Sequence, residues 1–459
     1  MRVLRFKNVL LGLLIVVLMQ SLALGQSSAI FDKQKLDTYL EKLAEKNKMM
    51  GSLTIDSAGS TVYHKSVGFR DVENNIQANT DTKYRIGSIT KTHTATMIMQ
   101  LVDEDKLALS TPLAGFYPQI PQAENITIEH LLRHQSGLYN FTNAPDFPDW
   151  MTEPRSKEEL LQIFYEDDSQ FEPGAQASYS NTNYVLLQFI LEDITGQSYA
   201  DLLQDRIVDP LNLQHTHYGD RIEPSENEAL SYQYQGKKWR AAPETALSIP
   251  GGAGAIVSTN SEMIGFIRAL FNGKLVSQQS IDKMTDIEQG LGMGLMRVPF
   301  NDRYAFGHNG GIDGFQSHLS YFPEEDVSIA LATNGLQHSM NDILIGALSI
   351  YFGHDFEIPS FDEKTITLSV EQMKKYVGVY TTDQLLMEIE VFIEGSTLKA
   401  QATGQQSFPL TANSETKMRF DQAGVVMEFD SLENGKYQHF TLNQGGGSFP
   451  FTRKASKEQ

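Results

Sequence analysis

Residues 87–102, GSITKTHTATMIMQLV, begin with a glycine and a serine and continue without proline into a long apolar run. The run is longer than an ordinary strand and carries no second glycine, so it predicts a buried helix that begins near Ser88. Positions three apart lie on one face of a helix, and the hydroxyl of Ser88 and the amine of Lys91 can therefore meet. The stretch combines a core helix with two reactive side chains at its start.

A serine hydroxyl is a poor nucleophile at neutral pH, and it needs a base. A neighbouring lysine can take the proton only if burial or nearby charge lowers the lysine pKa. The N-terminus of the helix beside Ser88 would also favour negative charge that develops there. The plainer interpretation is an ordinary helix start with a surface lysine at position 91, because serine and lysine fall three apart by chance in most long chains.

The elements around this helix predict the fold of the first part of the chain. Upstream we expect an amphipathic helix at 36–43 and a β-hairpin at 51–67. Downstream we expect four helices, then two strands and a closing helix, at 127–132, 158–164, 184–194, 262–270, 319–322, 327–332 and 343–352. This order predicts a mixed α/β (α+β) domain over residues 26–353. In it, an antiparallel sheet takes strands from both ends of the segment, and the middle forms an all-helical region.

A second unit is expected after Gly353, where the composition changes. Residues 354–367 carry Pro359 and several acids without a sustained period, which predicts a linker. Short runs that are typical of strands follow, at 387–393, 398–402, 418–420, 425–429 and 440–442. Residues 368–459 therefore predict a small antiparallel β-barrel or sandwich, with Asn434-Gly435 as a hairpin turn and no visible catalytic constellation.

The first 25 residues have the pattern of a signal peptide. Basic residues at positions 2, 5 and 7 precede an apolar run over 9–19 and the small residues of Ala23-Leu24-Gly25. This pattern predicts cleavage after residue 25 and export to the periplasm or the medium. An uncleaved anchor is the alternative, but the apolar run is well short of the roughly 20 residues that span a bilayer. We expect no membrane span in the mature chain.

Composition and charge exclude or disfavour several kinds of functional site. The sequence has no cysteine, which excludes disulfides, thiolate metal sites and cysteine nucleophiles. The formal net charge of −20 disfavours binding to phosphate backbones, so nucleic acid is not an expected partner. His130 with His134, and His215 with His217, could hold a metal, but no known zinc motif accompanies either pair. We expect neither a metal nor a cofactor, and we expect His134 to support the loop ahead of Ser136.

Two further motifs accompany Ser88 and Lys91. Tyr179-Ser180-Asn181 directly precedes an apolar helix, and His308-Asn309-Gly310 lies ahead of the last strands. Together with Ser88-x-x-Lys91, these motifs resemble the serine β-lactamases and penicillin-binding proteins. The match is most like the class C β-lactamase branch, which has DD-carboxypeptidase, D-aminopeptidase and esterase relatives. Further matching stretches extend the resemblance over roughly residues 50 to 350, at 68–71, 131–138, 171–174 and 251–254.

The resemblance implies catalytic roles for three side chains. Ser88 would form an acyl-enzyme, and Lys91 would help to deprotonate it. Tyr179 would pass the proton to the leaving group and later activate water. A phenol with a pKa of about 10 is a poor base, so Tyr179 would act either as an anion stabilised by the Lys91 ammonium or as a proton relay.

The resemblance also implies how the substrate would be held. Asn181 would contact a substrate carbonyl. The backbone N–H groups of Ser88 and Gly311 would form an oxyanion hole, and Gly310 beside it would allow the backbone to approach closely.

His308 departs from the pattern of many β-lactamases, which carry a lysine there that pairs with the substrate carboxylate. A histidine is largely neutral above its ordinary pKa of about 6.5. We therefore expect a serine hydrolase with peptidase or esterase action on a small-molecule or peptide substrate, peptidoglycan fragments among the candidates, and at most weak β-lactamase action. Arg297 could replace the lysine as carboxylate partner, although a surface arginine is the plainer interpretation.

An inactive relative that binds peptidoglycan fragments or a partner protein remains the alternative to an enzyme, because fold alone does not establish activity. The sequence does not indicate an oligomeric state.

Overall fold

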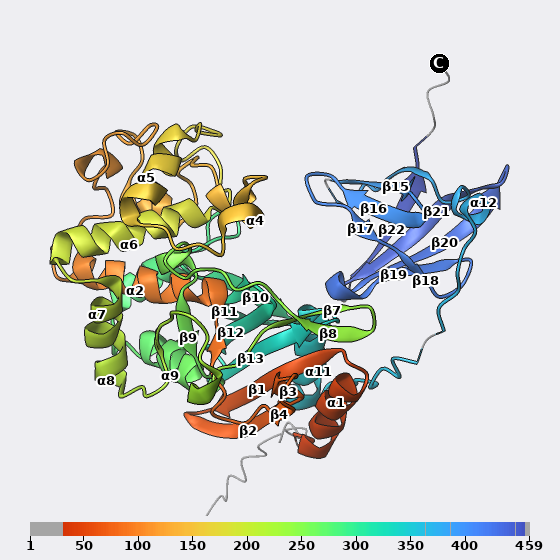
Figure 1. Cartoon of the computed structure of the whole chain (residues 1–459), viewed down its shortest axis with the longest axis horizontal. Helices are drawn as coiled ribbons and strands as arrows, with labels where there is room; N and C mark the ends of the chain where they lie inside the picture. Colours follow the sequence, from red (N-terminus) through yellow and green to blue (C-terminus); the bar gives the residue numbers. More distant parts are fainter. Residues whose placement is uncertain (1–30, 363, 386, 446, 455–459) are drawn as a thin grey trace, which may run out of the picture.

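The computed structural model describes residues 31–362, 364–385, 387–445 and 447–454 (Figure 1). The predicted signal peptide over residues 1–25 lies outside these ranges. Within them, no helix is both long enough and apolar enough to cross a membrane.

The central sheet of the first part of the chain takes its strands from both ends of that part, as predicted. Its antiparallel order is β10-β11-β12-β13-β1-β2. The six strands are β1 (Met49–Ser57), β2 (Ser60–Val67), β10 (Met296–Phe300), β11 (Arg303–Ile312), β12 (Phe315–Phe322) and β13 (Val327–Leu336). A hairpin of β7 (Tyr232–Gln235) and β8 (Lys238–Ala241) joins β13 at Gly335.

Each face of this sheet carries its own helices. On one face, α1 (Lys33–Glu45) and α11 (Met340–Phe352) lie side by side (Figure 1) and bury Leu40 and Ile343 against Leu53 and Leu331. On the other face, α9 (Asn260–Phe271) packs on β12 and β13. Because successive strand residues point to opposite faces, the same strands serve two separate apolar cores.

The helical region is built around α2 (Thr90–Asp103), the helix predicted from residues 87–102. Eleven of its fourteen residues are buried, and polar residues such as Thr92 and His93 are among them. It packs against α6 (Asn181–Thr195). Between residues 31 and 353, the other α-helices are α3 (Ile128–Leu132), α4 (Phe147–Trp150), α5 (Lys157–Glu166), α7 (Tyr199–Leu203), α8 (Asp209–Leu211) and α10 (Gln278–Thr285).

Local capping sets several of these helix ends. Ser156 and Glu159 form a reciprocal capping box at the start of α5. Gly196, with a φ of 70°, ends α6 in the left-handed conformation that favours glycine. Two small sheets complete this part of the chain, one of β3 (Phe69–Asp71) with β4 (Ile76–Gln77), and one of β5 (Tyr84–Arg85), β9 (Ile256–Ser258) and β6 (His217–Tyr218).

The last part of the described chain is a nine-stranded antiparallel sheet that nearly closes into a barrel (blue in Figure 1). Its order is β17-β16-β15-β14-β22-β21-β20-β19-β18, and the two end strands are consecutive in sequence. The strands are β14 (Gly378–Thr381), β15 (Glu388–Glu394), β16 (Thr397–Ala402), β17 (Phe408–Pro409), β18 (Thr411–Ala412), β19 (Lys417–Phe420), β20 (Val425–Glu433), β21 (Lys436–Gln444) and β22 (Gly447–Arg453). A short helix, α12 (Val370–Met373), precedes them. The barrel is one of the two architectures, barrel or sandwich, predicted for this part.

The barrel contacts the rest of the chain near the start of β1. Lys48 Nζ lies 2.8 Å from Asp421 Oδ2, and Gly424 lies against the side chain of Asp342 in α11. These contacts are on the side of the central sheet that α1 and α11 cover, away from the α9 side.

Candidate active site

Ser88 lies in a 3₁₀ turn, η1 (Gly87–Ile89), that runs directly into α2. Glycines allow this turn to approach strand β11 closely. A Cβ on Gly87, whose φ is 51°, would lie 2.7 Å from Gly311 N, and a Cβ on Gly310 would lie 2.0 Å from Ile86 O. A larger residue at either position would push the turn and the strand apart. The turn that carries Ser88 therefore rests against the backbone of Gly311.

Lys91 has no exposed surface, and its amine has three polar neighbours. Nζ lies 2.9 Å from Ser88 Oγ, 2.8 Å from Asn181 Oδ1 and 2.8 Å from the carbonyl oxygen of Ala253. Burial is the only cause that shifts the pKa of Lys91, and it lowers that pKa well below the usual lysine value. A neutral amine fits these contacts, because its two N–H groups can donate to the two carbonyl oxygens while its lone pair faces the Ser88 hydroxyl.

The side chain of Tyr179 hydrogen-bonds to that of Ser88. Lys91 Nζ is 4.8 Å from the centroid of the Tyr179 ring. Burial raises the pKa of Tyr179, and the bond with Ser88 offsets this only in part. Of the two roles that the sequence left open for this phenol, the proton relay is favoured over the anion.

The loop over residues 131–138 positions Tyr179. The ring of His134 stacks on that of Tyr179, with 4.4 Å between the ring centroids. Its backbone carbonyl accepts a hydrogen bond from Ser178 N at 2.8 Å, and its Nδ1 accepts one from Ser180 N at 3.1 Å. His134 is thus bonded to the residues on both sides of Tyr179, a role more specific than the loop support predicted from the sequence.

Asn181 contacts Lys91 directly. Its Oδ1 lies at the amine, its Nδ2 donates to Thr142 Oγ1 at 2.9 Å, and its backbone N–H donates to Asn140 Oδ1 at 2.9 Å. The amide oxygen therefore orients Lys91. The contact with a substrate carbonyl that the resemblance implies for Asn181 stays a prediction. The contributions of Asn140, Thr142 and the Ala253 carbonyl were not predicted.

His308 lies in β11 on the same site, with its ring centroid 6.1 Å from that of Tyr179. Only 4% of the residue is exposed. Burial, followed by the nearby charge of Lys91, lowers the pKa of His308 to about 3. Its Nδ1 lies 2.5 Å from the carbonyl oxygen of Asn309, which only accepts, so Nδ1 carries the proton and Nε2 is left as an acceptor.

The structure does not bring Arg297 to this cluster. Arg297 is exposed in β10 opposite Phe306, and its guanidinium lies over the ring of Tyr304, 4.2 Å from the centroid. Tyr304 precedes His308 by four residues of a strand, which corresponds to about 13 Å. This placement agrees with the interpretation of a surface arginine, because the guanidinium lies over Tyr304 and not beside His308.

The two glycines after His308 lie differently in the site. Gly310 is buried against Ile86, whereas Gly311 is exposed, and a Cβ on Gly311 would meet no atom within 4 Å. The backbone N–H groups of Gly311 and Ser88 remain the candidates for the oxyanion hole, because a substrate carbonyl has room beside Gly311.

The histidines considered as metal ligands have other contacts. Nδ1 of His130 accepts a hydrogen bond from Thr127 N in the capping box of α3. His217 Nε2 lies 3.3 Å from a carboxylate oxygen of Glu228. Over the described ranges, no group of three or more His, Cys, Asp or Glu side chains could hold a metal ion.

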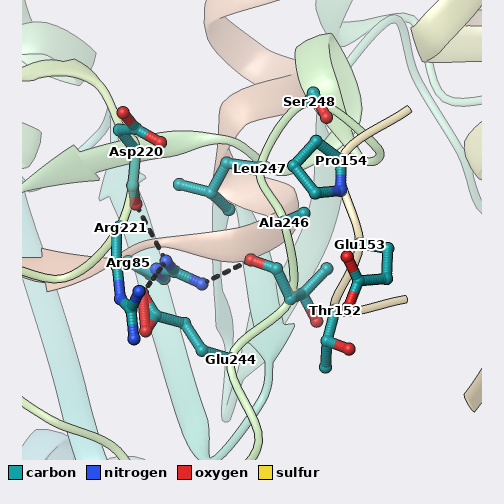
Figure 2. A pocket seen from close by; sticks show the side chains of 11 residues that line it. Arg85, Thr152, Glu153, Pro154, Asp220, Arg221, Glu244, Ala246, Leu247 and Ser248 are labelled. Atoms are coloured by element: carbon teal, nitrogen blue, oxygen red, sulfur yellow. Dashed lines mark hydrogen bonds and ion pairs between the residues drawn. The ribbon is translucent and has the colours of Figure 1, made fainter. Parts of the chain in front are cut away.

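A pocket of about 610 Å³ lies next to Arg85, three residues before Ser88 (Figure 2). Arg85 is buried and forms ion pairs with Asp313, at 2.9 Å, and with Glu244, at 2.7 Å. Figure 2 shows the guanidinium directed at Glu244 and at the carbonyl oxygen of Asp220. It also donates to the carbonyl oxygen of Thr245, at 2.9 Å. Because Asp313 follows β11 directly, these bonds join the segment before Ser88 to the strand that carries His308.

Arg85→Met is expected to lower the free energy of unfolding by about 3–5 kcal/mol, because the buried carboxylate of Asp313 would lose its cation. Urea unfolding of the purified chain measures this change. Lys374→Met, which breaks an exposed pair with Glu371, is the control and should have little effect. Equal effects of the two substitutions would show that the buried pair does not stabilise the site.

Comparison with known proteins gives a consistent picture. A family model described as Beta-lactamase matches residues 36–347. The chain is 25% identical over 445 residues to "Penicillin-binding protein 4*" of Bacillus subtilis strain 168, an alignment that covers 90% of this chain and 97% of that protein. It is 26% identical over 323 residues to "Teichoic acid D-alanine hydrolase" of Staphylococcus aureus strain MRSA252, which covers 68% of this chain and 77% of that protein. Among solved structures, the D-amino acid amidase from Ochrobactrum anthropi SV3 in complex with D-phenylalanine has a TM-score of 0.63 and 25% identity, over 69% of this chain and 98% of that chain.

Proposed function

Because this chain belongs to the beta-lactamase family of serine hydrolases, we propose that it hydrolyses amide or ester bonds of D-amino acid derivatives through an acyl-enzyme on Ser88. The observation that carries this proposal is the contact of 2.9 Å between Ser88 Oγ and a lysine amine whose pKa burial lowers. Two similar proteins, named as a D-amino acid amidase and a teichoic acid D-alanine hydrolase, support the substrate class.

In the acylation step, Ser88 Oγ attacks the substrate carbonyl carbon while the Lys91 amine takes the hydroxyl proton. The carbonyl oxygen gains negative charge, which the N–H groups of Ser88 and Gly311 stabilise. The Tyr179 phenol then donates its proton to the leaving amine or alkoxide and recovers one from the Lys91 ammonium. The bond between carbonyl carbon and leaving group breaks, and an ester on Ser88 remains.

In the deacylation step, a water molecule attacks the ester carbon. Its proton passes through the Tyr179 phenol to Lys91, and the Ser88 oxygen leaves with a proton returned by the same path. The products are the free acid and the original hydroxyl. Asn181 and the Ala253 carbonyl hold the amine in place through both steps, which keeps the lone pair directed at Ser88.

The neutral state of His308 favours substrates without a carboxylate next to the scissile bond. His308 has a pKa of about 3 and Arg297 lies over Tyr304, so neither offers a cation to such a carboxylate at neutral pH. Amidase or esterase action is therefore favoured over carboxypeptidase action.

A matched pair of substrates tests this electrostatic argument. We expect the ratio of kcat/KM for N-acetyl-D-alanyl-D-alanine amide to that for the free acid to stay constant between about pH 5 and pH 8. His308 titrates only near its lowered pKa of about 3, so its charge does not change in this range. A histidine with an ordinary pKa of about 6.5 would become cationic on acidification and would favour the acid. A ratio that falls on acidification would contradict the neutral His308.

The substrate class is tested by steady-state hydrolysis of D-phenylalanine amide, L-phenylalanine amide, a D-alanyl ester, D-alanyl-D-alanine and nitrocefin. We expect turnover of the D-amide and the ester, with the L-amide and nitrocefin at least about tenfold slower in kcat/KM. Preference for D-alanyl-D-alanine would favour a carboxypeptidase, and fast nitrocefin hydrolysis would favour a β-lactamase. No turnover and no labelling by a fluorescent penicillin would favour an inactive binding protein.

A further inference from the structure

The interior of the barrel is filled differently at its two ends. At one end, four rings pack against one another: Tyr380, Phe429, Phe440 and Phe451, with 4.9 Å between the centroids of Tyr380 and Phe440 and 5.0 Å between those of Phe440 and Phe451. All four residues are at most 3% exposed. This end of the barrel is a packed core with side chains in contact across it.

The other end is less completely filled. Its cavity has a volume of about 400 Å³, within the range of roughly 300–1,000 Å³ that is typical of small-molecule sites. Its lining is mainly apolar: Met387, Phe408, Phe420 and Ala423 are partly exposed, and Ile389, Ala402, Val425, Met427 and Leu442 are buried. Barrels of about this strand number are either filled by side chains or hold one small ligand. This barrel is filled at one end and has a cavity at the other.

The mouth of the cavity is polar but carries no charge. Gln405, Gln406, Ser407 and Gln444 lie there, and none of the described residues that line the cavity is Lys, Arg, Asp or Glu. Amide and hydroxyl groups donate and accept hydrogen bonds equally well, so they suit a neutral polar group. A charged head group would be drawn from water without an ionic partner, which is unfavourable.

We propose that this end of the barrel binds the alkyl chain of a neutral, single-chain amphiphile, with the polar head of the ligand among the three glutamines. The apolar depth excludes polar ligands such as sugars, because their hydroxyl groups would find no partners there. Met427 and the small Ala402 in the wall leave room for a flexible chain and adapt to it. This site is separate from Ser88 and does not depend on the proposed hydrolysis.

Isothermal titration of the full chain with dodecylglycerol, an ether that a hydrolase cannot cleave, tests the proposal. We expect saturable binding with one site. Ala402→Phe fills the cavity from β16 and should weaken binding at least about tenfold. Gln401→Phe is the matched control, because residue 401 is the outward-facing neighbour on the same strand and is exposed. Ala423→Phe, in the turn η7 (Asp421–Ala423), fills the mouth without altering a strand and should also weaken binding.

Two further binding measurements distinguish the barrel cavity from the active site and from a site for charged ligands. Ser88→Ala should bind dodecylglycerol as the wild type does, which distinguishes the barrel from the active site. Dodecanoate should bind at least about tenfold more weakly than the neutral ether. The proposal is overturned if the wild type does not bind, if both cavity-filling variants bind normally, if Gln401→Phe weakens binding as much as they do, or if dodecanoate binds as tightly.

Discussion

Ser88→Ala is expected to lower kcat/KM for the best amide or ester substrate by at least about 10⁴-fold, because no covalent intermediate can form without the hydroxyl. The remaining rate would come from substrate positioning and from the backbone N–H groups of residue 88 and Gly311. Steady-state kinetics of the purified variant measures the loss, and a circular dichroism spectrum like that of the wild type shows that the fold is kept.

Ser180→Ala is the control for this prediction. Ser180 belongs to the Tyr179 motif and is buried, but its hydroxyl donates to the carbonyl oxygen of Tyr139 at 3.2 Å and has no contact with Lys91. It should retain more than about a tenth of the wild-type activity. If Ser88→Ala retained as much, another group would be the nucleophile.

Lys91→Arg is expected to lower kcat/KM by about 10²–10⁴-fold, although it keeps a basic residue at the position. A guanidinium cannot lose its proton at usable pH and has no lone pair to offer the Ser88 hydroxyl. Lys157→Arg is the matched control, since Lys157 is partly exposed and pairs with Asp193 away from Ser88. Activity retained in Lys91→Arg would exclude Lys91 as the base.

The pH dependence of the wild type checks the same assignment. Protonation of Lys91 removes the lone pair, so kcat/KM should fall on acidification through the folded-state pKa of Lys91 and reach a plateau above it. Because burial lowers that pKa well below 10.5, the plateau should already be present far below the usual lysine value. A rate that continued to rise up to about pH 10.5 would indicate a lysine with an ordinary pKa.

Much of the fold follows from periodicity in the sequence. The apolar residues of α1 and the run of α2 predict helices, and the alternation in β15 predicts a strand. Two strands whose bounds the sequence did not predict show the limit. β11 contains three glycines and β22 contains Pro450, so neither has the composition of a strand. Each exists because of pairing with a strand beside it, a long-range effect that local composition does not contain.

The candidate active site, like the fold, could be predicted from the sequence only in part. Ser88, Lys91 and Tyr179 carry their chemistry in side chains at recognisable spacing, and they could be proposed from the sequence. The Ala253 carbonyl that orients Lys91 is a backbone group. The stretch 251–254 belongs to the family resemblance, but nothing in its residues indicates a contact with Lys91. The position of Arg297 depends on the register of β10 against β11, which places its guanidinium over Tyr304. Sequence proximity to His308 therefore does not by itself place the guanidinium beside it.

Peptide mapping by mass spectrometry after reaction with a fluorophosphonate tests the central claim most directly, because the probe traps a nucleophilic serine irreversibly. A single adduct on the peptide that contains Ser88, formed in step with the loss of hydrolysis and absent from Ser88→Ala, is the predicted result. An adduct on a different residue that accompanies full inactivation, or unchanged labelling in Ser88→Ala, would contradict it.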